Sequence, residues 1–235
     1  MCGRFAFYSA AEAVRDLFGV HAPDLAVIAQ FNIAPTDLAA VVRVDDGVRS
    51  VSMLRWGLLP FWAKDKRMAS RMINARAETV AEKPAYRAAF RERRCVVPAD
   101  GYYEWITGAD GKQPYYISRE DEQPIGFAGL WERWRDNSVA DDSLCEEQII
   151  ETFTVLTMPS SGNIESLHHR MPVMLDDVAA EHWLAGDGAN PPALRELNAE
   201  ARAQELRAWP VAKTVNNARN ESPALVNPLN KYEFD

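Results

Sequence analysis

The sequence of 235 residues contains little from which disulfide, metal or membrane structures are built. It has three cysteines, Cys2, Cys95 and Cys145, an odd number whose spacing matches neither a disulfide framework nor a zinc site. No apolar run approaches the roughly 20 residues that span a bilayer. The first residues, MCGRFAFYSAAE, have no hydrophobic signal core. We therefore expect a cytoplasmic protein of the bacterial-type cytosol or nucleoid, with no membrane partner and no metal.

Internal repeats, low-complexity segments, obvious interdomain linkers and glycine-rich phosphate loops are also missing. Hydrophobic residues make up 47% and charged residues 26% of the chain, values that exclude disorder and fibrous character. The length allows a single large domain. We expect one domain over residues 1–235 and no organic cofactor.

Positive charge is scarce overall but concentrated in one stretch. The chain carries 26 basic and 34 acidic side chains, a net charge of −8, which by itself argues against a nucleic-acid partner. Between Lys64 and Arg94, however, ten basic residues stand against four acidic ones, giving +6 locally and −14 for the rest. This asymmetry is compatible with one basic binding face on an acidic body. It is equally compatible with the solvated surface of a helix around Arg87–Arg94.

Short apolar and β-branched runs alternate with turn signals along most of the chain. Residues 38–44 and 48–56 flank Asp45-Asp46-Gly47 and predict a hairpin. Further short strands are predicted at 95–98, 102–106, 115–118, 125–134, 149–157 and 211–215.

Helices are predicted from their end signals. A capping box at Ser9–Glu12 opens a helix that Gly19 ends, and Pro84 opens another. The predicted helices cover residues 9–19, 84–94, 176–185 and 191 to just before Trp209, with an acidic loop at 136–147 and a loop-like tail at 216–235. Many short strands with a few separated helices favour an α+β fold. Its core would be a largely antiparallel, barrel-like sheet with several peripheral helices.

Cysteine at position 2 is the most informative single residue. Methionine aminopeptidases remove Met1 when the next side chain is small, so we expect the mature chain to begin with Cys2. An amino-terminal cysteine carries a free amine, with a pKa of about 7.7–8.0, and a thiol, with a pKa of about 8.5. The amine condenses with an aldehyde to an imine, and the thiol then closes a five-membered thiazolidine. No internal cysteine can perform this reaction.

Four other segments place polar side chains next to apolar or aromatic ones. They are residues 55–62 (RWGLLPFW), 74–79 (NARAET), 101–105 (GYYEW) and 166–172 (SLHHRMP). A carboxyl among aromatic neighbours, as at Glu104, favours its neutral form, which a general acid near pH 7 requires. Aromatic rings beside lysine and arginine suit single-stranded nucleic acid, because rings stack on bases and cations follow phosphates.

Each of these segments also has a purely structural interpretation. Glu104 would then pair with Arg93 or Arg94. The other side chains open to such an interpretation are Trp56 and Trp62 as core residues, Asn74 in a buried turn, and one of His168 and His169 as a bystander. Taken singly, none of the segments decides between the two interpretations.

Taken together, the segments form an ordered set. The blocks are residues 1–5, 32–36, 55–60 with Trp62, 74–79, 94–98, 101–105, 127–132, 168–172, 210–211 and 215–217. This set resembles the SOS response-associated peptidase (SRAP) family, whose members protect abasic sites in single-stranded DNA. The blocks run from residue 2 to about 217, so the resemblance covers nearly the whole chain and leaves 218–235 as a tail.

The resemblance implies a substrate and its covalent chemistry. The substrate would be an abasic deoxyribose in single-stranded DNA, reacting as its ring-opened aldehyde. Cys2, in the amino-terminal block, would form the imine and then the thiazolidine crosslink. Asn74 would hold the α-amine, and Glu104 would shuttle protons during ring opening and imine formation. An imine left open would permit β-elimination, so a weak strand-cleaving lyase activity is expected beside the crosslink.

The resemblance also implies a histidine and a set of DNA contacts. His168 stands two residues before Arg170, the family's offset, although His169 leaves an alternative imidazole for protonating the sugar oxygen or the imine. The residues expected to bind DNA, as phosphate ligands or as groups that shape the cleft, are Arg4, Pro35, Trp62, Arg71, Arg76, Trp105, Thr157 and Arg170. The acidic loop would repel DNA, so we expect it on the far side from the cleft.

Two other functions are compatible with the same residues. Cys2 with Glu104 and His168 would serve an amino-terminal-nucleophile peptidase or amidohydrolase, including removal of its own Met1. Alternatively, the chain would be a DNA-binding module in which Cys2 is incidental. Covalent capture that depends on the aldehyde would distinguish abasic-site processing from both of these functions. We expect a monomer that acts beside the replication machinery.

Overall fold

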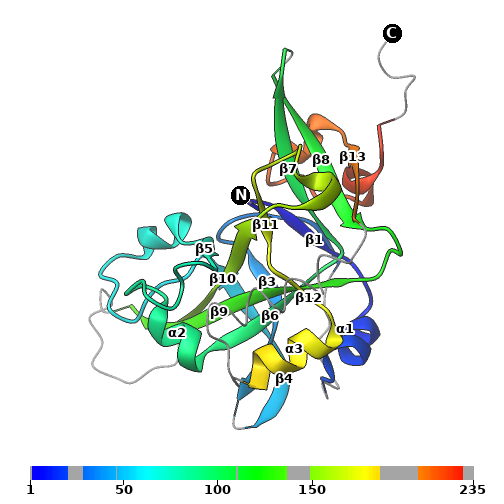
Figure 1. The fold of residues 1–235 in the computed structure, drawn as a ribbon. Coiled ribbons are helices and arrows are strands. Elements are labelled where there is room, and N and C mark those ends of the chain that lie inside the picture. The colour runs from blue at the N-terminus through cyan, green and yellow to red at the C-terminus, as the bar shows by residue number, and fades with distance from the viewer. Residues whose placement is uncertain are drawn as a thin grey trace.

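The computed structural model describes residues 2–20, 29–45, 47–109, 111–136, 149–185 and 206–229. Its core is a sheet that closes on itself. In this sheet the strand order is β11-β10-β4-β3-β6-β9-β12, β5 joins β10 at the side, and an additional β9–β10 pairing closes the barrel (Figure 1). The bounds are β3 Leu38–Asp45, β4 Val48–Trp56, β5 Asn74–Arg76, β6 Arg94–Ala99, β9 Ile125–Arg135, β10 Ile149–Pro159, β11 Arg170–Pro172 and β12 Met174–Leu175.

A second, five-stranded sheet carries the amino terminus. Its order is β13-β8-β7-β1-β2. The bounds are β1 Phe5–Phe7, β2 Gln30–Ile33, β7 Gly101–Gly108, β8 Gly111–Arg119 and β13 Leu206–Pro210. Within the described residues the parallel pairings are β10 with β4 and β10 with β5, and every other ladder is antiparallel. The expected α+β fold with a largely antiparallel, barrel-like core is confirmed.

Two hairpins show how local signals fix the sheets. The predicted β3–β4 hairpin is confirmed, with pairing from Leu38↔Arg55 to Asp45↔Val48 and Gly47 at φ 78°. The β7–β8 hairpin is longer than predicted, because its ladder continues to Gly108↔Gly111 through exposed residues. Those arms have no buried face, so apolar alternation does not mark them.

The helices lie outside the barrel, and α1 and α3 contact each other (Figure 1). Their bounds are α1 Ala11–Phe18, α2 Arg87–Glu92 and α3 Asp177–Ala185, with short 3₁₀ turns η1 Lys66–Arg71, η3 Gly162–Ile164, η4 Lys213–Asn216 and η5 Pro223–Val226. Gly19 ends α1 at φ 60°, as predicted. Asp176 caps α3 as predicted, because its Oδ1 accepts the Ala179 N–H at 2.8 Å.

Two local predictions in the first half of the chain are wrong. Ser9 does not cap α1, because its hydroxyl donates to Asp100 at 2.5 Å and Ala10 stands at the cap position. The second helix is shorter than 84–94, because the Lys83 carbonyl accepts N–H groups in a preceding turn and β6 already begins at Arg94.

The carboxyl-terminal prediction also needs correction. Residues 206–208 are not helical, because they form β13, which pairs with β8. Residues 211–215 are a bridge followed by the turn η4, not a strand. The first part of the helix predicted from residue 191, and nearly all of the acidic loop 136–147, lie outside the described residues.

Aromatic side chains fill the barrel. Phe5 packs edge-on against Trp56 and Phe127, and Trp56 stacks on Phe153. The structural interpretation of Trp56 is therefore confirmed, since it is fully buried, whereas Trp62 is 46% exposed. A smaller cluster of Ala6, Tyr103, Tyr116, Val211, Val215 and Leu225 packs the carboxyl-terminal segment onto the second sheet.

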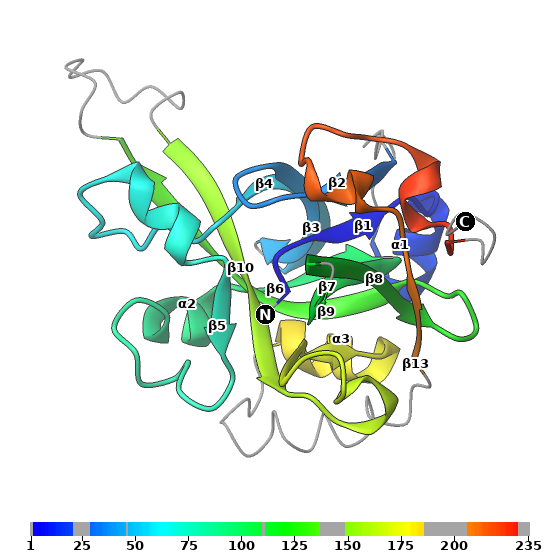
Figure 2. The same ribbon diagram turned by 90° about the horizontal axis from the view of Figure 1, so that it is seen from above.

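The topology brings the amino terminus to the middle of the molecule. β1 lies between β2 and β7, and the chain before it runs toward β5 and β10 in both views (Figures 1 and 2). The described helices are all too short or too polar to cross a bilayer.

Candidate active site

Cys2 is held at the place where the two sheets meet. The Asn74 side-chain amide, on β5, donates to the Cys2 carbonyl at 2.7 Å. The Tyr103 N–H, on β7, donates to the Arg4 carbonyl at 2.9 Å, which extends the β1–β7 ladder toward the chain end. The first residues are thereby fixed from both sides.

The side-chain amide of Asn74 uses its N–H donor, but its oxygen acceptor is unpaired among the described residues. Its Nδ2 binds Cys2, while its Oδ1 is buried and has no hydrogen-bond partner among the residues that the structure describes. The Tyr86 hydroxyl donates to the Asn74 carbonyl at 3.2 Å, and β5 is paired with β10. Since a buried acceptor without a donor is costly, this oxygen is suited to an N–H group placed beside Cys2.

Glu104 and His168 form a close pair in the same region. Glu104 is 4% exposed, and its Oε1 lies 3.7 Å from His168 Nδ1. The Arg170 backbone N–H donates to the same Nδ1 at 3.0 Å and fixes the ring. Burial raises the pKa of Glu104, although the positive charges of the amino terminus and His168 act in the opposite direction. A carboxyl of this kind retains a proton at higher pH than a surface glutamate.

The Cys2 thiol is completely buried. It donates to the Arg4 carbonyl at 3.8 Å. Burial raises the pKa of the thiol strongly, and the charge of Glu104 raises it further. The sulfur is therefore a neutral thiol near pH 7 and not a thiolate.

Comparison with known proteins decides the family of this site. The model of the family "SOS response associated peptidase (SRAP)" matches residues 1–218. The chain belongs to the SRAP family. The resemblance found in the ordered sequence blocks is thereby confirmed.

Relatives of this SRAP chain match it over most of its length. It is 34% identical over 229 residues to abasic site processing protein YoqW of Bacillus subtilis (strain 168), covering 96% of this chain and 99% of that protein. It is 33% identical over 201 residues to abasic site processing protein HMCES of Gallus gallus, covering 79% and 59%. A crystal structure of a Bacteroides thetaiotaomicron protein superposes with a TM-score of 0.77 at 25% identity, covering 97% and 100%.

Arg4 and Trp105 lie next to each other on the SRAP site. The Arg4 guanidinium lies 6.0 Å from the centre of the Trp105 ring, and the Trp105 indole N–H donates to Asn216 Oδ1 at 2.7 Å. Arg4 Nη1 donates to Asn32 Oδ1 at 2.5 Å and to the Val215 carbonyl at 2.9 Å. Both residues were expected to bind DNA, and the structure brings their side chains together.

Arg170 has a fixed protein partner. Its guanidinium makes two hydrogen bonds to the Glu78 carboxylate, at 2.5 and 2.9 Å, and also donates to the Thr157 carbonyl. Thr157 is fully buried between β5 and β11, and its expected part in shaping the DNA cleft stays a prediction. Arg76, opposite Thr157 on β5, is exposed. Of these three residues, Arg76 alone presents an open surface.

Replacing Glu78 with glutamine is expected to lower the free energy of unfolding by about 1 kcal/mol at pH 7, discounted for the partial exposure of Glu78. The Arg170 guanidinium holds the pKa of Glu78 below its ordinary value. The ion pair therefore stabilises the fold above the unfolded-state pKa of about 4.3, and this contribution is lost as the pH falls through the folded value. Thermal unfolding at pH 7 and pH 3.5 checks the prediction, because the wild-type and Glu78→Gln midpoints should converge in acid. A constant difference would contradict it.

The remaining predicted DNA contacts lie on exposed or half-buried turns. Arg71, at the end of η1, is exposed, and Pro35 is half-buried beside Thr36, which has φ 77°. Trp62 is exposed, and so is its neighbour Phe61, at 66%. Phe61 was not predicted as a site residue, although it lies in the RWGLLPFW block, whose aromatic rings suggested DNA binding.

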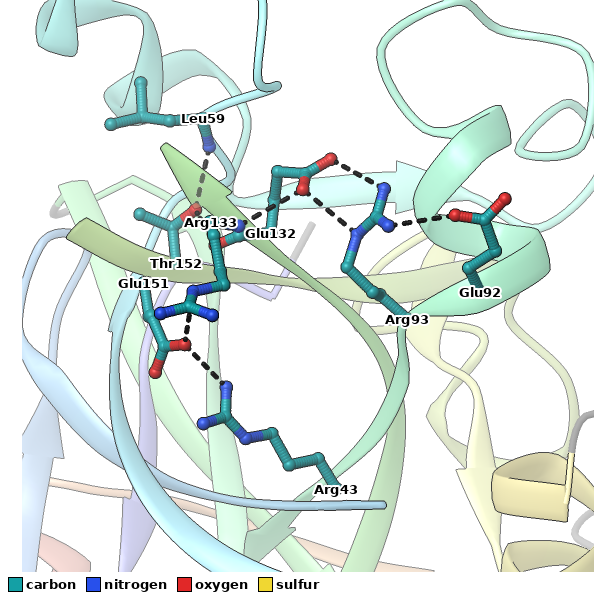
Figure 3. A network of polar contacts seen from close by, with 8 residues as sticks. All are labelled: Arg43, Leu59, Glu92, Arg93, Glu132, Arg133, Glu151 and Thr152. Carbon is teal, nitrogen blue, oxygen red and sulfur yellow. Dashed lines mark hydrogen bonds and ion pairs between the residues drawn. The ribbon is translucent and has the colours of Figure 1, made fainter. Parts of the chain in front are cut away.

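The structural alternative for Glu104 is wrong. Arg93 instead pairs with Glu132 at 3.0 Å and with Glu92 at 3.1 Å, in a separate polar network (Figure 3). The Arg94 guanidinium donates to the Phe90 carbonyl. Among the described residues, no group of three histidine, cysteine, aspartate or glutamate side chains is placed to hold a metal ion.

Proposed function

We propose that this SRAP protein processes abasic sites in single-stranded DNA by capturing the ring-opened aldehyde on Cys2. The observation that carries the proposal is that Asn74 binds Cys2, that the charge of Glu104 acts on the Cys2 thiol, and that His168 lies beside Glu104. The names of the relatives, abasic site processing proteins, support the substrate. The sequence blocks that carry the resemblance contain all four residues.

The proposed reaction needs Met1 to be removed first. The freed α-amine of Cys2 adds to the aldehyde carbon, and the resulting carbinolamine loses water to give an imine. The Cys2 S–H then adds across the C=N bond, so that sulfur bonds to carbon and the proton goes to nitrogen. One water is released overall, and the product is a thiazolidine. An imine that does not close would permit β-elimination, which supports a weak lyase activity.

The neighbouring side chains have matching roles in this proposal. The unpartnered Asn74 Oδ1 would accept an N–H of the free amine and direct its lone pair at the aldehyde. Glu104 would protonate the sugar oxygen during ring opening and the hydroxyl that leaves as water, because its pKa is raised. His168 would return protons between these steps.

The state of the thiol favours aldehyde capture over peptide hydrolysis. A cysteine hydrolase attacks with a thiolate, whereas burial and the charge of Glu104 keep the Cys2 thiol protonated. In aldehyde capture the amine attacks first, and the thiol reacts only with an already formed imine. The neutral thiol is compatible with that order.

The DNA strand would pass between charged and aromatic groups. Arg4, Arg71 and Arg76 would contact phosphates, and Arg170 would do so only by exchanging its Glu78 partner. The groups that would shape the path are Pro35, Trp62 and Trp105, with Thr157 acting from within through Arg170. A monomer that acts beside the replication machinery remains our prediction.

A denaturing-gel crosslinking assay with intact-mass detection tests the proposed function. Mature protein is mixed with single-stranded DNA that carries one abasic site, with borohydride-reduced abasic DNA as control. We expect a denaturation-resistant adduct whose mass equals the chain from Cys2 plus the DNA minus one water. Cys2→Ala should retain the amine but lose the stable adduct. Cys2→Ser should give an adduct only after trapping with borohydride.

The outcomes separate the three functions. Absence of any adduct from a folded chain with Met1 removed would overturn aldehyde capture, and peptide or amide turnover would then favour the hydrolase. Salt-sensitive DNA binding without aldehyde-dependent capture, unchanged in Cys2→Ala, would favour a binding module.

A further inference from the structure

Asn32 lies at a buried junction between distant parts of the chain. It stands on β2, is 2% exposed, and uses both halves of its amide. Its Oδ1 accepts from Arg4 Nη1 at 2.5 Å. Its Nδ2 donates to the carbonyls of Asn217 at 3.0 Å and Asn220 at 2.8 Å, and lies 3.4 Å from that of Val215. One side chain thus joins the amino-terminal segment to residues 215–220.

We name residues 213–220 the C-terminal clamp. The clamp touches two residues of the proposed DNA site directly. The Val215 carbonyl accepts from Arg4 Nη1, and Asn216 Oδ1 accepts from the Trp105 indole. Val215 also packs into the smaller core cluster, so the clamp is anchored by apolar contact as well as by hydrogen bonds. Loosening the clamp would therefore release Arg4 and Trp105 together.

Arg4 is fixed on one side only. Nη1 is held by Asn32 and the clamp, whereas the buried Nε has no hydrogen-bond partner among the described residues. The backbone carbonyl of the same residue accepts from the Cys2 thiol. The guanidinium is thus held at Asn32 and the clamp, beside Trp105, with N–H donors left for an anion.

We propose that Asn32 is a positioning residue for DNA binding: it locks the C-terminal clamp to β2 and orients Arg4 toward a phosphate of the bound strand. This proposal rests on the DNA binding that the proposed function includes, and not on its covalent step. An amide is required at this position, because the junction needs an acceptor for Arg4 and donors for carbonyl oxygens. Aspartate supplies the acceptor but no donor, and alanine supplies neither.

The test measures noncovalent binding to single-stranded DNA that contains a tetrahydrofuran abasic analogue, which has no aldehyde. Affinities are measured across a salt series for wild type, Arg4→Gln, Asn32→Ala, Asn32→Asp and the double variant Arg4→Gln/Asn32→Ala. Trp183→Phe is the matched control. Trp183 lies on α3, and its indole N–H donates to the Cys95 carbonyl at 2.9 Å, so this variant also removes a buried hydrogen bond.

We expect Arg4→Gln and Asn32→Ala each to weaken binding about tenfold, the effect of losing one charge-assisted hydrogen bond. The salt slope is the slope of the logarithm of the binding constant against the logarithm of the salt concentration. Each variant should reduce its magnitude by about 0.7, the value for one phosphate contact on a single strand. The double variant should be no weaker than either single variant, because both remove the same contact. Asn32→Asp should also weaken binding, and Trp183→Phe should leave the slope unchanged.

The proposal is overturned if the Asn32 variants fold and keep the wild-type salt slope, or if their effects add to that of Arg4→Gln. It is also overturned if the wild type does not bind the analogue. Should Asn32→Ala fail to fold, Asn32→Asp and Asn32→Ser decide by the same criteria. Parallel crosslinking of aldehyde-bearing DNA keeps the two proposals apart. A shared loss of slope without any wild-type adduct would overturn the proposed function and leave the role of Asn32 standing.

Discussion

Replacing Glu104 with glutamine is expected to slow aldehyde capture by about 100- to 10,000-fold, the range for removal of a general acid or base. Glutamine keeps the shape and the hydrogen-bonding capacity of the side chain but cannot transfer a proton. Glu104 is buried, and its Oε1 lies 3.7 Å from His168 Nδ1. A single-turnover crosslinking time course at saturating DNA measures the effect.

The pH dependence of Glu104→Gln should differ from that of the wild type. Burial raises the pKa of Glu104 in the folded chain. The acid-catalysed step should therefore slow in the wild type as the pH rises through this value, whereas the residual rate of Glu104→Gln should lack that titration. A variant that keeps the wild-type rate and pH profile would remove Glu104 from the mechanism.

Stability should change in the opposite direction from activity. Because the folded-state pKa of Glu104 is raised, its contribution to stability is complete below the unfolded-state pKa and is lost as the pH rises through the folded value. At pH 8 glutamine removes the cost of a buried ionised carboxyl, so Glu104→Gln should unfold at a higher temperature than the wild type. Near pH 4 the difference should disappear.

Glu132→Gln is the matched control for Glu104→Gln. Glu132 is also a buried glutamate whose pKa burial raises, but it pairs with Arg93 in the separate network of Figure 3. Its replacement should leave the capture rate unchanged. An equal loss of rate in both variants would mean that buried carboxyls act through the fold and not through the chemistry.

Gly101→Ala is expected to lower the free energy of unfolding by about 3 kcal/mol or more. A β-carbon at this buried position would overlap the Ile117 carbonyl oxygen and lie 2.5 Å from the Tyr116 ring. Neither neighbour can yield easily, because β8 is paired on both sides and Tyr116 is buried. The strand would have to move, and Glu104 lies on the same strand.

Urea denaturation of Gly101→Ala and Gly108→Ala measures this effect. Gly108 lies on the same strand, but the nearest atom to an added β-carbon is 3.8 Å away. Its substitution should change the free energy of unfolding by no more than about 0.5 kcal/mol. Equal effects at the two positions would show that the close approach at Gly101 is relieved without cost.

Features with local signals could be predicted from the sequence. Gly47 predicts the β3–β4 hairpin, Gly19 the carboxyl end of α1, and Asp176 the amino end of α3. Turn and cap residues determine the backbone only within a few positions of themselves. Local signals misled where a distant group competed. Ser9 has the sequence of a helix cap, but its hydroxyl binds Asp100, 91 positions away.

The sequence by itself determined the family, the α+β class and the order of the blocks that carry Cys2, Asn74, Glu104 and His168. Tertiary structure alone decided that Arg170 binds Glu78, that Thr157 is buried and that Val215 holds Arg4 from 211 positions away. Such contacts join segments that only the closed barrel and the second sheet bring together. They leave no periodicity in the sequence, because each depends on where another chain segment passes.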